Sequence, residues 1–322
     1  MRKTLGAVAV GCGLVLFAQA APEPVTAGGP LTPITVQRLL LTDAERVGQR
    51  IVAVGDRGYV IVSDDQGKTW KRAASPAAPL LTAVDFVDDQ SGLAVGHDSV
   101  FLATRDRGET WTQVFSAPAE QRPLLDVLFL TAERAIAVGA YGAYYESADG
   151  GRSWTGRKVI ADDKHLNAIL EVGDAALVIL GEAGTILVSN DAGKSWTTVP
   201  APYKGSFFGG LIANDGAVVA FGMRGRIFRS ADRGKSWKQV DNPSAASLMG
   251  GDKLPDGALV VAGAAGTVLV SRDDGRSFVP LASGTTRTFA KALLGAPNEV
   301  LLLGEAGARS VALPSAMKRV AP

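Results

Sequence analysis

The chain has 322 residues, of which 47% are hydrophobic and 20% are charged, and its formal net charge is +1. These proportions are those of a globular protein, and the near balance of charge excludes a sequence-wide binding surface for nucleic acid or an anionic membrane. Cys12 is the only cysteine, so the chain has no internal disulfide and no zinc–thiolate site.

Residues 1–20 have the pattern of a secretory signal peptide. Arg2 and Lys3 precede an uncharged apolar run over residues 5–17, and Ala18-Gln19-Ala20 places small residues at the cleavage positions. The run is shorter than the roughly 20 residues needed to span a bilayer, which disfavours a retained anchor. Lipidation of Cys12 remains an alternative. We expect an exported protein with no stable membrane insertion after cleavage.

Residues 21–34, rich in proline and glycine, are predicted to form a leader before the folded domain of residues 35–322. Within that domain one eight-residue phrase recurs six times. We call it the box, and its pattern is S/T-x-D-x-G-x-S/T-W/F. All five tryptophans occupy its last position. The copies are 41 to 43 residues apart and begin at Ser63, Thr104, Ser147, Ser189, Ser230 and Ser271.

A second phrase, a glycine pair of pattern G-x-x-G, precedes each box and indicates seven units. In the second unit a serine, Ser99, takes the place of the second glycine. The seventh unit has lost its box, which would lie at residues 311–314. The first glycines, 41 to 43 residues apart, are Gly55, Gly96, Gly139, Gly181, Gly222, Gly263 and Gly304.

Each unit contains four short apolar segments separated by Gly- and Asp-rich turns, which is a strand pattern. Continuous apolar runs such as residues 258–262 indicate sheets buried on both faces. Seven such sheets predict an all-β fold, a seven-bladed β-propeller with four-stranded antiparallel blades. A solenoid is the main alternative. The last unit lacks a good fourth strand, so we expect an N-terminal strand from residues 30–37 to complete blade 7.

Each box is predicted to form the turn between the third and fourth strands of its blade. Its Asp would accept backbone N–H groups, its Gly would adopt a positive φ, and its Trp would pack between blades. One invariant carboxylate per box is too few for a calcium loop, so the role is structural and neither a metal nor a cofactor is expected. The residues concerned are Asp65, Asp106, Asp149, Asp191, Asp232, Asp273, Trp70, Trp111, Trp154, Trp196 and Trp237.

Strand direction places the G-x-x-G loops and the connections between blades on the face opposite the boxes. Loops at one end of a rigid β scaffold are common binding sites, and Arg and aromatic side chains are frequent hot spots. For any one of these residues, a solvated loop position is the plainer interpretation. The candidates for binding a protein client are Arg57, Asp98, Tyr141, Lys204, Arg224 and Arg287.

The box resembles the bacterial neuraminidase repeat of sialidases, sortilin-type receptors and xyloglucan-cleaving propellers. With the signal sequence and the seven units, residues 35–313 look most like the photosystem II stability/assembly factor family. This resemblance implies a non-catalytic, monomeric propeller that binds protein clients and assists assembly of a membrane or envelope complex. It would act in the periplasm, or in the thylakoid lumen of a photosynthetic organism.

A glycoside hydrolase of sialidase-like or xyloglucanase-like type is the alternative. The Phe-Arg-Ile-Pro signature of sialidases is absent, and Glu182 and Glu305 belong to blades on opposite sides of the ring. Glycosidases need two carboxyl groups roughly 5 to 9.5 Å apart. Asp56, Asp98 and Glu305, in consecutive blades, form the best remaining acidic cluster. The two histidines, His97 and His165, lie on different blades without Cys partners, which disfavours a metal site.

Overall fold

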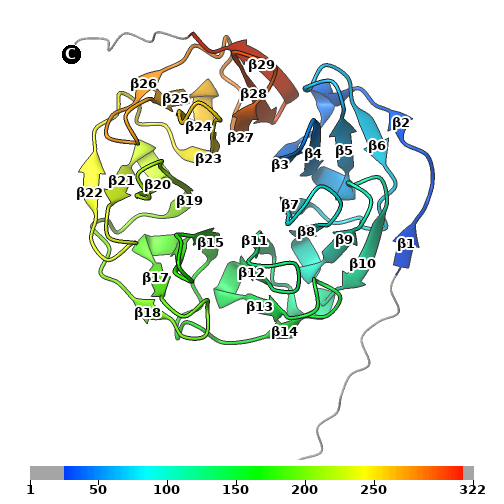
Figure 1. Ribbon diagram of the computed structural model, residues 1–322, viewed down its shortest axis with the longest axis horizontal. Coiled ribbons are helices and arrows are strands. Elements are labelled where there is room, and N and C mark those ends of the chain that lie inside the picture. Colours follow the sequence, from blue (N-terminus) through cyan, green and yellow to red (C-terminus); the bar gives the residue numbers. More distant parts are fainter. Residues whose placement is uncertain (1–24, 315–322) are drawn as a thin grey trace, which may run out of the picture.

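The computed structural model describes residues 25–314, which form seven antiparallel sheets arranged around a central axis (Figure 1). The predicted seven-bladed β-propeller is therefore confirmed. The predicted signal peptide and Cys12 lie outside the described residues. Among residues 25–314, no helix is long and apolar enough to cross a membrane.

Blades 3 to 6 contain four strands each, which we letter A to D from the axis outward, and neighbouring strands pair antiparallel. Blade 3 contains β11 (Leu124–Phe129), β12 (Ala135–Gly139), β13 (Tyr144–Ser147) and β14 (Thr155–Gly156). Blade 4 contains β15 (Leu166–Glu171), β16 (Leu177–Gly181), β17 (Ile186–Ser189) and β18 (Thr197–Thr198). Blade 5 contains β19 (Phe207–Ile212), β20 (Val218–Gly222), β21 (Ile227–Ser230) and β22 (Lys238–Val240). Blade 6 contains β23 (Leu248–Lys253), β24 (Leu259–Gly263), β25 (Val268–Ser271) and β26 (Val279–Pro280).

The other three blades depart from four strands. Blade 1 adds β2 (Thr32–Pro33) to β3 (Leu41–Val47), β4 (Arg50–Gly55), β5 (Val60–Ser63) and β6 (Lys71–Ala73). Blade 2 adds β1 (Val25–Ala27) to β7 (Leu81–Phe86), β8 (Gly92–Gly96), β9 (Phe101–Thr104) and β10 (Trp111–Phe115). Blade 7 has three described strands, β27 (Phe289–Leu294), β28 (Glu299–Gly304) and β29 (Gly307–Ala312).

The expectation that an N-terminal strand completes blade 7 is wrong. β2 pairs with β6 of blade 1, and β1 pairs with β10 of blade 2, so the segment runs along the outside of these two blades (Figure 1). The physical reason is that strand D of any blade presents a free outer edge, and an extended segment can pair with whichever edge it reaches. Here the segment pairs with the first two blades of the chain.

The ring is closed instead by packing between blades 1 and 7. The short 3-10 helix η1 (Val36–Arg38) leads into β3, and the N–H of Gly307 donates to the carbonyl of Leu39 at 2.9 Å. Leu39 is buried in one apolar cluster with Leu293 and Leu301 of blade 7. Residues 25–314 contain seven such apolar clusters. The B strands supply buried side chains to them because their runs are apolar at successive positions.

Each box forms the same hydrogen-bonded turn between strands C and D. In blade 4, Asp191 accepts bonds from the N–H of Ser195 at 2.9 Å and from the hydroxyls of Ser189 and Ser195 at 2.7 and 2.6 Å. The hydrogen bonds from Ser195 and Ser189 lower the pKa of Asp191 to about 2. A carboxylate that satisfies several donors of its own turn stabilises that turn locally.

The glycine of each box also sets the spacing between blades. Gly67 of blade 1 has φ +88°, and a Cβ there would lie 2.9 Å from Leu301 of blade 7. The equivalent Gly275 of blade 6 faces Val219 of blade 5 at 2.5 Å in the same way. A side chain at this position would push adjacent blades apart, so the box contributes to interblade packing as well as to its own turn.

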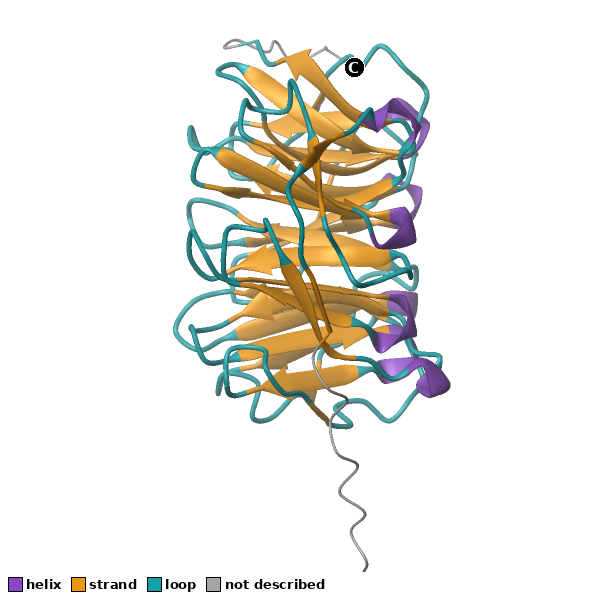
Figure 2. Cartoon of the chain, turned by 90° about the vertical axis from the view of Figure 1, so that its right-hand side faces the viewer, coloured by secondary structure: helices purple, strands orange, loops and turns teal. Residues whose placement is uncertain are grey.

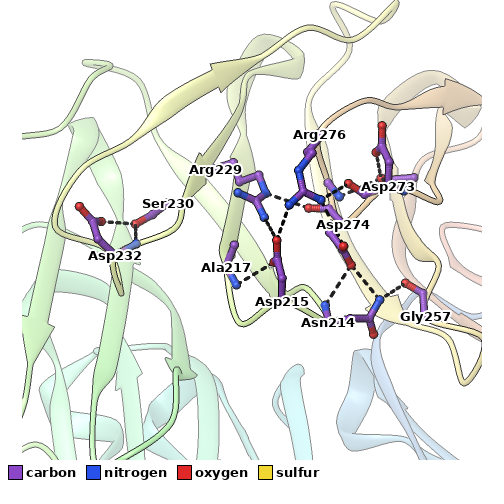
Figure 3. A network of polar contacts seen from close by, with 12 residues as sticks. Asn214, Asp215, Ala217, Arg229, Ser230, Asp232, Gly257, Asp273, Asp274 and Arg276 are labelled. Carbon is purple, nitrogen blue, oxygen red and sulfur yellow. Dashed lines mark hydrogen bonds and ion pairs between the residues drawn. The ribbon is translucent and has the colours of Figure 1, made fainter.

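Polar contacts on the same face add to the interblade connection, as Figure 3 shows between blades 5 and 6. Asp215, in the A–B hairpin of blade 5, forms ion pairs with Arg229 of its own blade and with Arg276 in the box of blade 6. Asn214 donates to Asp274 at 2.9 Å and to the carbonyl of Gly257 at 3.0 Å. Many charged groups at this junction are thus paired with each other.

Candidate functional site

The two faces of the ring carry different turns. The B–C turns of blades 1 to 6 are 3-10 turns and all lie on one side of the molecule (Figure 2). We call this side the turn face and the opposite side the box face. The turns are η2 (Asp56–Gly58), η3 (His97–Ser99), η5 (Ala140–Gly142), η6 (Glu182–Gly184), η7 (Met223–Gly225) and η8 (Ala264–Gly266).

The second glycine of each pair lets the B–C turn approach the connection that leads to the next blade. Gly58 has φ +65°, and a Cβ there would lie 2.0 Å from the carbonyl oxygen of Ala77. In blade 2 the substituting Ser99 also has a positive φ of 48°, and its hydroxyl donates to the carbonyl of Arg122 at 2.8 Å. The two loops of each blade therefore form one rigid unit on the turn face.

The residue before that second glycine adopts the left-handed conformation in all six turns, with φ between 50° and 58°. This conformation is uncommon for residues other than glycine and persists where the surrounding structure holds it. Four of the six positions carry large or charged side chains, and two carry alanine. They are Arg57, Asp98, Tyr141, Ala183, Arg224 and Ala265.

All six predicted client-binding residues are exposed on the B–C turns or on the connections between blades. The side chain of Arg57 is 81% exposed, and its Nε lies 3.8 Å from Asp56. Tyr141 is 52% exposed, and its ring packs edge-on against His165 at 5.1 Å between centroids. Lys204 and Arg287 lie on D–A connections. Phe207, at the start of strand A of blade 5, is fully buried in the core.

Three acidic residues of this face have structural partners. Asp56 accepts a bond from the N–H of Leu40 at 3.3 Å, Glu182 from that of His165 at 3.1 Å, and Glu305 from that of Thr288 at 3.2 Å. Each therefore holds the entry to strand A of its own blade. Within residues 25–314, no group of three or more His, Cys, Asp or Glu residues could hold a metal ion.

A cavity of about 430 Å³ opens beside Tyr141 and the outer part of blade 3. Tyr145 donates to Glu120 at 2.7 Å, and Arg157 pairs with Glu146 at 2.8 Å. Aromatic walls with charged rims suit peptide or side-chain binding. Of the six client-binding candidates named from the sequence, only Tyr141 lines this cavity.

The central channel holds a charged cluster that the sequence analysis missed. A cavity of about 350 Å³ is lined by the inner strands. On half of the ring, side chains of one blade bind the backbone of the next, which satisfies the exposed edge of that inner strand. Asp43 accepts a bond from the N–H of Val84 at 3.0 Å, and Asp126 accepts one from that of Ile169 at 2.8 Å.

Burial changes the acidity of this cluster. It raises the pKa of Asp85 to about 7 and the pKa of Asp126 to about 7. It also raises the pKa of Glu45 well above its ordinary value, with a further increase from the neighbouring Asp85. Lys291 donates to Asp43 at 2.9 Å. Burial lowers the pKa of Lys291, but the carboxylates of Asp43 and Asp252 outweigh it and raise that pKa.

The fold and the boxes define the chain as a seven-bladed propeller of Asp-box repeats. The BNR/Asp-box repeat model matches residues 61–72. A family model described as photosynthesis system II assembly factor YCF48 matches residues 113–258. The resemblance to the photosystem II stability/assembly factor family is therefore confirmed.

Solved structures agree with this resemblance at the level of the fold. YCF48 bound to a D1 peptide has a TM-score of 0.70 at 18% identity, covering 89% of this chain and 96% of that chain. YCF48 from Cyanidioschyzon merolae has a TM-score of 0.69 at 16% identity, covering 89% and 100%. The GH74 xyloglucanase from Xanthomonas campestris has a TM-score of 0.67 at 15% identity, covering 87% of this chain and 53% of that chain. A search of the curated proteins finds no match.

Proposed function

We propose that this protein is a non-catalytic binding protein that takes up protein clients on its turn face. The observation that carries the proposal is the set of turns that hold Arg57, Asp98, Tyr141 and Arg224 outward on a rigid scaffold. Because the backbone of these turns is held in one conformation, less conformational freedom is lost on binding, and aromatic and arginine side chains are frequent hot spots. Lys204 and Arg287 extend the same surface.

The comparisons support this class of function. One structural neighbour is YCF48 in complex with a D1 peptide, so a propeller of this fold binds a peptide. By analogy, the client here is a component of a membrane or envelope complex whose assembly or stability the protein assists. In a photosynthetic organism that complex would be photosystem II.

The glycoside hydrolase alternative has less support on this face. Asp56 and Glu305, two members of the best acidic cluster, each bind a backbone N–H at the start of strand A. Carboxylates in such structural bonds are poorly placed to act as a general acid and a nucleophile. The xyloglucanase neighbour shares the fold, and a fold supports many unrelated functions.

Charge reversal on opposite faces of the same blades tests the proposal. Arg57→Glu with Arg224→Glu changes the turn face of blades 1 and 5. Lys68→Glu with Lys235→Glu makes the same change in the boxes of these blades, where a Glu already occurs at the equivalent position 109. We expect the first double variant to lose its crosslinked partners from envelope extracts and the second to retain them. Circular dichroism should show that both variants are folded.

Equal recovery of partners by both double variants would overturn the turn-face proposal. Turnover of a panel of β-glucans and sialosides by the wild-type protein would restore the enzyme hypothesis.

Export and oligomeric state are part of the same proposal and have their own readouts. We expect the mature protein to be monomeric and to begin at Ala21 in a periplasmic or lumenal fraction, as N-terminal sequencing and light scattering would show. A mature N-terminus at Cys12 carrying lipid would instead identify a lipoprotein.

A further inference from the structure

Among residues 25–314, no strand pairs with the outer edge of blade 7. β29, its third strand, is the outermost described strand of the blade, whereas strand C of every other blade is covered by a strand D. The difference is visible in burial, because β17 is buried at all four positions while Arg309, Ser310 and Ala312 of β29 are exposed. An uncovered strand edge presents unpaired N–H and C=O groups and can accept an added strand.

A pocket adjoins this edge at its turn-face end. The pocket has a volume of about 250 Å³, with an apolar floor that includes the buried Phe289 and the small residues Ala306 and Ala308. Two arginines, Arg287 and Arg309, line it and are exposed. Neither guanidinium has an ion-pair partner among residues 25–314.

The positive charge of the pocket favours an anionic ligand. The lining residues include no carboxylate, and Glu305 next to them directs its carboxylate to the N–H of Thr288. Two guanidinium groups without an ion-pair partner, next to an apolar floor, are suited to a carboxylate whose residue carries a small or apolar side chain.

The direction of an added strand fixes which end of a peptide reaches the pocket. In the four-stranded blades strand D pairs antiparallel with strand C, so it runs from the box face to the turn face. β29 begins at Gly307 on the turn face. A peptide paired antiparallel with β29 therefore has its C-terminal end at the pocket.

We propose that the open edge of blade 7 binds the C-terminal segment of a client as a fourth strand, with its α-carboxylate held by Arg287 and Arg309. The inference rests on the proposed client-binding function and deepens it, since it names the segment that is recognised. Main-chain hydrogen bonds along β29 supply affinity, and the two arginines supply selectivity for a free C-terminus.

An array of peptides of about eight residues, enough to span a typical strand, tests this, with each sequence in free-acid and amide form. Fluorescence anisotropy then measures, in solution, the affinity of the protein for each peptide that binds on the array. We expect the free acid to bind at least tenfold more tightly than the amide, since charge-assisted bonds are worth roughly a factor of ten each. Arg287→Ala with Arg309→Ala should remove that preference, whereas Lys68→Ala with Lys235→Ala should keep it.

Backbone methylation of the peptide tests strand addition without altering the protein. Only alternate N–H groups of an added strand point to β29. N-methylation of one alternate set should therefore abolish binding, while methylation of the other set should leave it intact. Tolerance of both sets, or equal binding of acid and amide, would overturn the proposal.

Residues 315–322 of the chain are the other possible occupant of the edge. If their deletion raises peptide affinity tenfold or more, the edge is taken by this segment in the intact protein, and the assignment to a client is wrong. Unchanged affinity supports it. If the Arg57/Arg224 double variant loses its envelope partners but the protein shows no preference for the free carboxylate, this inference is wrong and the turn-face function stands.

Discussion

Aspartates of this protein occupy two environments that move their pKa values in opposite directions. In the box of blade 2, partial burial raises the pKa of Asp106, but hydrogen bonds from Thr110 and Thr104 outweigh it and lower that pKa. In the channel, burial dominates and raises the pKa of Asp126. The same side chain therefore stabilises a turn as a carboxylate and meets a desolvation penalty beside the axis.

Asp106→Ala should destabilise the protein by about 1–2 kcal/mol, the usual cost of removing a side-chain cap. The Asp accepts bonds from the N–H and hydroxyl of Thr110 at 2.9 and 2.6 Å, and both donors lose their partner in the variant. Urea denaturation measures the change. Asp89→Ala, at an exposed position of the same blade, is the control and should stay within about 0.5 kcal/mol of wild type.

Asp126→Asn should change the pH dependence of stability. A carboxyl whose folded pKa is near 7 and whose unfolded pKa is about 3.9 favours the folded state below pH 4, and this contribution is lost as pH rises from 4 to 7. The amide introduced by the substitution does not ionise, so the variant does not lose this stability as pH rises. We expect the variant to be more stable than wild type at pH 8 by about 1–3 kcal/mol, discounted because water reaches the channel, and similar at pH 4.

Thermal unfolding between pH 4 and pH 8 would measure this difference. The exposed Asp163→Asn should follow the wild-type profile. An Asp126→Asn curve parallel to wild type over the whole range would show that the carboxyl ionises without penalty in the folded state.

At the level of elements, the repeated phrases predict most of the architecture. The spacing of the G-x-x-G pairs gives the number of blades, and the position of the boxes gives the direction of every strand, so the face that carries Arg57 and Tyr141 follows from the sequence. The pairing of the N-terminal segment cannot be predicted from these phrases. β1 and β2 have three and two residues, and their pairing depends on which blade edge is free rather than on their own pattern.

The acidic residues that line the channel also could not be identified from the sequence, for a physical reason. Asp126 lies in the run Leu124–Phe129, which is otherwise apolar, and the register of strand A shifts between Leu124 and Asp126. The same shift occurs in each inner strand, for example between Leu41 and Asp43. A bulge changes which side chains face the axis, so simple alternation cannot identify them.

Removal of residues 25–33 should leave the ring closed. β1 and β2 cover the outer edges of blades 2 and 1 and make no pairing with blade 7. We expect the melting temperature to fall by only a few degrees, with the protein still monomeric and resistant to limited proteolysis. Leu39→Ala, which leaves a gap in the cluster between blades 1 and 7, should cost about 2–4 kcal/mol.

A larger effect of the deletion than of Leu39→Ala would contradict this account of closure. The two variants are compared in the same denaturation experiment, since both changes affect blade 1.

At the scale of the whole molecule, the inner wall of the ring has two kinds of junction. Blades 1 to 4 reach the next blade with polar side chains such as Thr42, whose hydroxyl donates to the carbonyl of Leu81 at 2.6 Å. Blades 5 and 6 instead have glycines in strand A, and a Cβ on Gly250 of blade 6 would lie 2.2 Å from the carbonyl oxygen of Ala290 in blade 7. Close backbone approach there replaces the side-chain bridges.

Gly250→Ala should therefore strain the ring at the junction of blades 6 and 7. Overpacking of this kind costs typically 1–3 kcal/mol, and the urea midpoint should fall accordingly. Gly28→Ala, where a Cβ would meet nothing within 4 Å, is the matched control and should leave the midpoint unchanged. Equal midpoints for the two variants would show that blades 6 and 7 can separate without cost.

The path of the N-terminal segment also fixes an order of events during folding. Val25 pairs with Gln113, so β1 cannot dock until blade 2 has formed, whereas the ion pair between Asp43 and Lys291 must wait for the seventh blade. Contacts separated by so much sequence form slowly because the intervening chain must first be ordered. The molecule should thus pass through an open arc, with its first two blades covered on the outside and the gap between blades 1 and 7 the last to close.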